Sequence, residues 1–102
     1  MHWTNRFDSR ERALADEILQ QVRALAPYDE RADHVIIDSA LPDLGVASLG
    51  ALTLQYHLDA VHDVVLSVEF LLSAQTVAEI VRKVAERCAE NERAVATCAE
   101  AE

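Results

Sequence analysis

Ser48 is the side chain whose setting in this sequence best suits chemistry. Residues 41–45 (LPDLG) lead towards it, and Leu49 follows it directly. Because a glycine ends the approach and helical apolar spacing begins just after it, we expect Ser48 in the first turn of a helix with its hydroxyl in solvent. No nearby residue supplies the base that would activate this hydroxyl as a nucleophile. The pattern indicates a serine that another enzyme modifies, and therefore a carrier rather than a catalyst.

Other kinds of site fit this sequence less well. A hydrolase nucleophile elbow needs Gly-x-Ser-x-Gly, and although Gly50 matches, Val46 stands where the first glycine belongs. His57 and His62 are five residues apart and point in different directions on a helix, so no metal site is predicted. The simplest alternative for Ser48 is that it only caps its helix. Since no acid–base constellation is visible, we expect a protein that is not an enzyme.

Length and composition describe one small, acidic domain over residues 1–102. Hydrophobic residues make up 51% of the chain but aromatic residues only 5%, so the core must consist of aliphatic side chains. The formal net charge of −9 disfavours binding to nucleic acid or to an anionic membrane surface, and would suit a basic protein partner. Cys88 and Cys98 are ten residues apart, which fits no metal motif. No stretch resembles a signal peptide or a membrane span, so we expect the chain to be cytoplasmic, and we expect a monomer.

Helical periodicity predicts an all-α fold. The expected elements are three main helices and one short helix, over residues 9–26, 48–61, 76–88 and, for the short one, 67–72. Residues 28–43 are interpreted as a long loop whose apolar side chains enter the core.

Capping boxes mark two of the predicted helix starts. Asp8 precedes the first helix with Glu11 three residues later, and Thr76 precedes the last helix with Glu79 three residues later. Residues 1–7 are expected to fray, and the weakly apolar segment beyond Arg87, including residues 90–102, is expected either to extend the last helix or to fray.

The helix expected over residues 48–61 carries two apolar stripes when it is projected at roughly 100° per residue. The first stripe consists of Ala51, Leu54, Leu58 and Val61, and the second of Leu49, Leu52 and Tyr56. The first stripe is expected to face the core. The second needs a neighbouring segment, such as the 28–43 loop, or a visiting protein. Because the second stripe lies beside Ser48, we predict that it binds partners.

The segment from Asp43 to Leu49 (DLGVASL) resembles the phosphopantetheine attachment site of acyl and peptidyl carrier proteins, whose usual pattern is Leu-Gly-x-Asp-Ser-Leu. The likeness covers nearly the whole chain. A first helix, a long loop, the serine at a helix start, a short helix and a last helix beginning at Thr76-Val77 follow the family order. The resemblance implies a free-standing, carrier-protein-like four-helix bundle with 4′-phosphopantetheine on Ser48.

What the resemblance implies about chemistry suits this position. A helix N-terminus favours the added phosphate, and the thiol of the arm holds acyl or aminoacyl groups as thioesters. The implied partners are a phosphopantetheinyl transferase, an acyl- or aminoacyl-loading enzyme, and downstream synthase or tailoring enzymes. Leu49, Leu52 and Tyr56 would form the apolar part of the docking surface.

One residue departs from the family pattern. Ala47 stands where the most familiar members have aspartate, and Gly50 and Thr53 stand where fatty-acid carriers tend to be acidic. Polyketide or nonribosomal-peptide biosynthesis fits this departure better than fatty-acid synthesis. The alternative hypothesis is a small helical interaction or regulatory protein that carries no prosthetic group.

Overall fold

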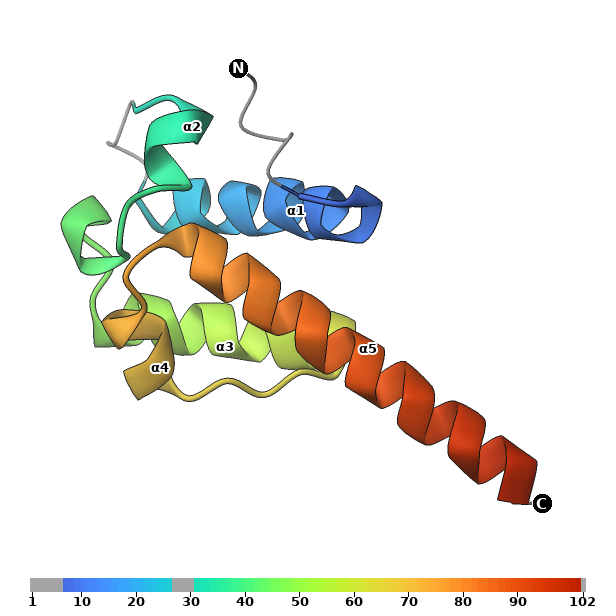
Figure 1. Cartoon of the computed structure of the whole chain (residues 1–102). Helices are drawn as coiled ribbons and strands as arrows, with labels where there is room; N and C mark the ends of the chain where they lie inside the picture. The colour runs from blue at the N-terminus through green and yellow to red at the C-terminus, as the bar shows by residue number, and fades with distance from the viewer. Residues whose placement is uncertain (1–6, 27–30, 102) are drawn as a thin grey trace.

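The computed structural model describes residues 7–26 and 31–101, with side chains described as far as residue 93. Within these ranges the chain is helical and contains no strand, so the all-α prediction is confirmed. The elements are α1 (Ser9–Leu25), α2 (Asp33–Ile36), the 3₁₀ turn η2 (Pro42–Leu44), α3 (Ser48–His62), α4 (Val68–Ser73) and α5 (Val77–Ala101). Figure 1 shows α5 extending beyond the ends of α1 and α3 towards the C-terminus.

The first helix begins as its capping box predicts. The amide of Glu11 donates to Asp8 Oδ1 at 2.9 Å, and the amide of Asp8 donates to Glu11 Oε1 at 3.1 Å. These two bonds satisfy backbone donors that have no partner within the helix. α1 therefore starts at Ser9, as predicted, and ends at Leu25, one residue before the predicted end.

The last helix begins with a variant of the predicted box. The amide of Glu79 donates to Thr76 Oγ1 at 3.3 Å, but the Glu79 carboxylate accepts from the amide of Gln75, at 2.9 Å, and not from that of Thr76. The predicted end at residue 88 is too early, since α5 continues to Ala101, and of the two alternatives for the segment beyond Arg87 the structure has the extended helix. The predicted short helix near 67–72 lies at Val68–Ser73, where the Ser67 hydroxyl accepts from the amide of Phe70.

The segment predicted as a long loop is only partly a loop. It contains the helical turns α2 and η2, while its first residues, 28–30, lie outside the described ranges. Its apolar residues enter the core as expected, because Ile36, Ile37 and Leu41 are buried, although Val35 is exposed. Turns of this kind satisfy backbone groups that a buried irregular segment would leave unpaired.

Backbone hydrogen bonds fix this segment to the start of α5. The amide of Val77 donates to the carbonyl of Ser39 at 2.9 Å, and the amide of Ala78 donates to that of Ile37 at 3.0 Å. These amides are among the helix N-terminal donors that need partners from outside the helix. The position of the segment that leads to Ser48 is therefore set by the last helix.

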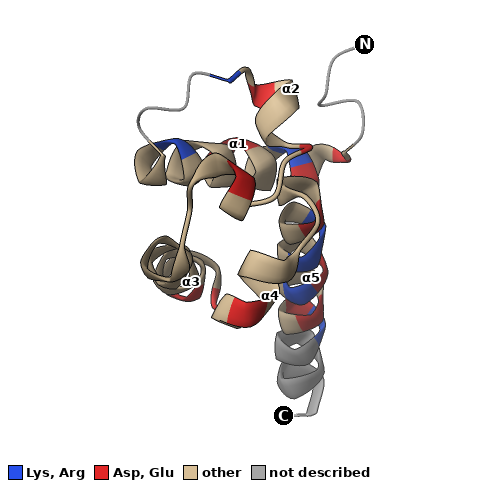
Figure 2. Ribbon diagram, turned by 90° about the vertical axis from the view of Figure 1, so that its left-hand side faces the viewer, with Lys and Arg blue, Asp and Glu red and all other residues tan. Residues whose placement is uncertain are grey.

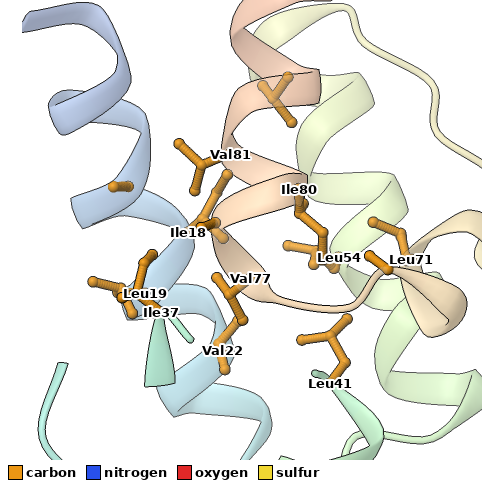
Figure 3. Packing of buried hydrophobic residues seen from close by; sticks show 14 of the residues in the cluster. Ile18, Leu19, Val22, Ile37, Leu41, Leu54, Leu71, Val77, Ile80 and Val81 are labelled. Carbon is orange, nitrogen blue, oxygen red and sulfur yellow. The ribbon is translucent and has the colours of Figure 1, made fainter. Parts of the chain in front are cut away.

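One apolar core joins the helices (Figure 3). Side chains from α1, α3, α4, α5 and the segment before η2 meet in it, and the members labelled in the figure include Ile18, Leu54, Leu71, Ile80 and Leu41. No polar or charged residue is buried among the described residues. The core is aliphatic as composition predicts, apart from Phe7. Phe7 is buried, so the expectation that residues 1–7 fray is wrong for this residue, while residues 1–6 lie outside the described ranges.

Candidate functional site

Ser48 is the first residue of α3 and is exposed to solvent. The residue in the N-cap position is Ala47, whose side chain makes no capping hydrogen bond. Within the described part of the chain, no hydrogen bond involves the Ser48 hydroxyl. The alternative in which Ser48 is merely the helix cap is therefore wrong, and the hydroxyl is free to react.

A tight turn at Gly45 lies directly before the start of α3 and Ser48. Gly45 adopts a left-handed conformation with φ 82°, which costs a glycine little and other residues more. Its amide donates to the carbonyl of Pro42 at 3.1 Å, and the next amide, that of Val46, donates to the carbonyl of Leu41 at 3.0 Å. Val46 is buried as a result, and the backbone then emerges at Ala47 and Ser48.

Gly50 is needed for a different reason. A Cβ atom built on it would lie 2.8 Å from Cγ1 of Val46, which is closer than side-chain carbons approach one another. The missing side chain lets Val46 pack under the first turn of α3. Both glycines of the chain thus shape the approach to the same serine.

An open depression of about 410 Å³ adjoins the serine. It is lined by Ser48 together with Pro42, Gly45, Val46, Ala47 and Leu72. Leu72 comes from α4, so this surface joins two helices and the turn η2. Sequence reasoning missed Pro42 and Leu72 as neighbours of Ser48, since no local pattern connects them with it.

The second apolar stripe of α3 is exposed in part. Leu49 is 78% exposed and Tyr56 65%, as expected of a surface that is not used by the core. Leu52 is half-buried, so the expectation of a largely accessible side chain is wrong for it. Projection at roughly 100° per residue explains the difference, because Leu52 lies about 40–45° nearer to the core side than Leu49 and Tyr56.

The first stripe of α3 faces the core with one exception. Ala51, Leu54 and Leu58 are buried as predicted, whereas Val61 is 53% exposed. Asp63 ends the helix in a left-handed conformation, and Val64 directly after it is buried. The turn after α3 thus brings Val64 into the core at this end, and Val61 remains outside.

The two histidines of α3 meet on one carboxylate of α1. His57 Nε2 lies 3.1 Å from Glu17 Oε1, and His62 Nε2 contacts Glu17 Oε2. The prediction that they point in different directions is wrong in this respect, since helix packing makes them converge on Glu17. Among the described residues, no group of three or more His, Cys, Asp or Glu side chains is placed to hold a metal ion.

Cys88 shows no sign of a reactive thiol. It is half-buried in α5, and burial raises its pKa. Arg10 opposes this rise, while Glu92 and Glu17 add to it. A raised pKa leaves less of the nucleophilic thiolate at neutral pH. The side chain of Cys98 lies outside the described part of the chain.

Three comparisons with known proteins add no assignment to this geometry. No protein-family model matches the chain, and neither a curated protein nor a solved structure matches it. No helix in the described ranges has the length and apolar character needed to cross a bilayer. The feature of the described residues that points to a function is an exposed serine at the start of a helix, with apolar surface around it.

Proposed function

We propose that this chain is a cytoplasmic acyl or peptidyl carrier protein that bears 4′-phosphopantetheine on Ser48. The observation that carries the proposal is the free, exposed hydroxyl at the first position of α3, held beyond the Gly45 turn. A carrier requires no base beside this hydroxyl, because the modifying enzyme supplies the catalysis. Polyketide or nonribosomal-peptide biosynthesis remains the proposed setting.

The residues around Ser48 fit such a group. A phosphodiester on Ser48 would lie beside the first turn of α3, where unpaired backbone amides favour an anion. The open apolar depression between Pro42, Val46 and Leu72 leaves space next to the hydroxyl. The group supplies a thiol on a long arm, and the chain supplies a rigid attachment point and a surface for its enzymes.

Three classes of partner follow from this function: a phosphopantetheinyl transferase, an acyl- or aminoacyl-loading enzyme, and synthase or tailoring enzymes that use the loaded group. Each must reach Ser48, so each must cover the surface near the start of α3. Of the exposed apolar side chains of α3, Leu49 and Tyr56 lie nearer to Ser48 than Val61 does, so such partners would bury these two, with Leu52 contributing its accessible part.

The test is the intact mass of the protein after co-expression with a broad-specificity phosphopantetheinyl transferase. We expect the wild type to gain the mass of one group and Ser48→Ala to gain none. Ser9→Ala is the matched control, since Ser9 is also an exposed serine at the first position of a helix but lacks the glycine turn before it. Modification of Ser48→Ala, or loss of modification in Ser9→Ala, would contradict the assignment.

A second candidate is a small helical interaction protein without a prosthetic group. The observation in its favour is Ala47, which leaves the N-cap of α3 without the carboxylate usual beside a modified serine. In that case the wild type would stay unmodified under the same co-expression, while the exposed apolar side of α3 would still serve a partner.

A further inference from the structure

One side of α3 forms a continuous exposed ridge. Leu49, Thr53, Tyr56 and Ala60 are spaced by four, three and four residues, which places them on one face of a helix, and all four are exposed. We call these four residues the α3 ridge. At about 1.5 Å per residue it extends about 16 Å from a point next to Ser48.

The polar side chains in and beside the ridge are bonded within the molecule. Thr53 Oγ1 donates to the carbonyl of Leu49 at 3.0 Å, so the hydroxyl of Thr53 is already bonded within the helix. Gln55 Nε2 donates to the carbonyl of Leu66 at 2.8 Å, and His57 is paired with Glu17. The phenol of Tyr56 is therefore the main polar group that the ridge offers to a partner.

Charged residues are also absent from the part of α3 that carries Leu49, Thr53 and Tyr56. No Asp, Glu, Lys or Arg occurs from Ser48 to Leu58, although the whole chain carries a net charge of −9. Asp59 is the first carboxylate of α3, about 16 Å along the axis from Ser48. Figure 2 shows the contrast between α3, with few charged positions, and α5, where both signs alternate.

We infer that the enzymes acting on Ser48 receive the α3 ridge in an apolar, uncharged groove with one hydrogen-bonding group for the Tyr56 phenol. The inference rests on the proposed function and specifies the chemistry of its partners. A basic patch placed against the ridge from Leu49 to Tyr56 would lose the hydration of its Lys or Arg side chains, and Asp59 at the far end of the ridge is the only carboxylate that α3 could supply to compensate for it up to that point. An apolar groove gains from burying the leucine and the aromatic ring, in the usual manner of helix-in-groove recognition.

The experiment measures kcat/KM for modification of Ser48 by a purified broad-specificity phosphopantetheinyl transferase with coenzyme A. Ionic strength is varied between about 0.05 M and 0.5 M, over which screening shortens the reach of charge–charge attraction severalfold. We expect kcat/KM to change by less than about twofold, because little charge is neutralised in the complex. Tyr56→Ala should lower kcat/KM about tenfold through KM, and Tyr56→Phe should lower it less.

Two further variants make the test sharp. Thr53→Glu places a carboxylate in the middle of the ridge, so it should slow modification if the groove is apolar and speed it if the partner surface is basic. Val65→Ala is the matched control, because Val65 is 67% exposed but lies after α3 and outside the ridge, and it should leave kcat/KM unchanged. Circular dichroism checks that each variant keeps its helices.

The outcomes separate this inference from the function on which it rests. Faster modification of Thr53→Glu together with a steep loss of rate at high salt would overturn the apolar groove and leave the carrier function standing. Equal effects of Tyr56→Ala and Val65→Ala would also overturn it. A wild-type protein that gains no mass would overturn the carrier function itself, and the inference with it.

Discussion

The helices α3 and α5 each pack one side against the core, but the side chains on their outer sides differ. Both bury an aliphatic stripe in the common core, with Leu54 and Leu58 in α3 and Ile80 and Val81 in α5. The outer side of α5 is charged and carries pairs such as Arg87 with Glu90, whose nearest atoms are 3.7 Å apart. The outer side of α3 carries Leu49 and Tyr56 instead.

The difference fits the proposed function, in which α3 and not α5 meets the partner enzymes. A charged outer surface keeps a helix hydrated, and i,i+3 pairs add a little helix stability. Exposed leucine and tyrosine side chains next to a free serine do neither, so folding alone does not explain them. The polar residues of α3 strengthen the contrast, because Gln55 and His57 are directed to bonds within the molecule. We infer that α5 stabilises the bundle while α3 both stabilises it and presents a surface.

The largest expected effects come from the core stripes of the two helices. Leu58→Ala in α3 and Ile80→Ala in α5 should each lower the free energy of unfolding by about 2–5 kcal/mol, since both side chains are fully buried. Leu49→Ala should change it by no more than about 0.5 kcal/mol, and half-buried Leu52→Ala should fall between. Urea unfolding followed by circular dichroism measures all four. A loss in Leu49→Ala as large as that in Leu58→Ala would show that the outer side of α3 belongs to the core.

The next largest change in the free energy of unfolding is expected at Glu17, through which α1 contacts α3. Glu17→Ala removes the acceptor of both His57 and His62 at a site where all three side chains are less than a third exposed. Leaving such groups without a partner should cost about 1–3 kcal/mol in the free energy of unfolding. Glu17→Gln keeps one acceptor oxygen and should lose less. If both variants unfold at the same urea concentration as the wild type, the two histidines do not hold α3 in place.

The starts of α3 and α5 allow two substitutions whose expected effects on the free energy of unfolding are opposite in sign. α3 begins without a side-chain cap at Ala47, whereas the Thr76 hydroxyl accepts from an amide at the start of α5. Ala47→Asp should raise the free energy of unfolding by about 1 kcal/mol, and Thr76→Ala should lower it by about the same amount. Thermal unfolding reads out both changes. Ala47→Asp should also speed modification of Ser48 by a general transferase, and an equal or slower rate would show that Ala47 is no handicap.

The smallest effect is expected on the charged side of α5. Glu90→Ala removes an exposed ion pair with Arg87, so it should change the free energy of unfolding by no more than about 0.5 kcal/mol. The transferase rate should not change either, because α5 is not the helix that bears Ser48. A clear loss of rate in Glu90→Ala would mean that α5 also contacts the enzyme, and the division of roles between the two helices would fail.

Much of the fold could be predicted because its signals are local. The capping box of Asp8 and Glu11, the start of α3 at Ser48 and the burial of Ala51, Leu54 and Leu58 all depend on residues within a few positions of one another. Errors arose where an element ends or where a second segment intervenes. Val61 was expected in the core, but the chain turns at Asp63 and buries Val64. The long loop contains two helical turns that its irregular apolar spacing did not indicate.

The sequence by itself determined that Ser48 begins a helix, that a glycine ends the approach to it, and that α3 has more apolar surface than one core contact needs. Those properties follow from backbone preferences and helical spacing, which act over a few residues. Only the tertiary structure decided which polar side chains of α3 have hydrogen-bond partners elsewhere in the molecule. His57 and His62 meet Glu17 across 40 and 45 residues of chain, and Leu72 lines the surface beside Ser48. Such contacts depend on how whole helices pack, and no local pattern of side chains specifies that packing.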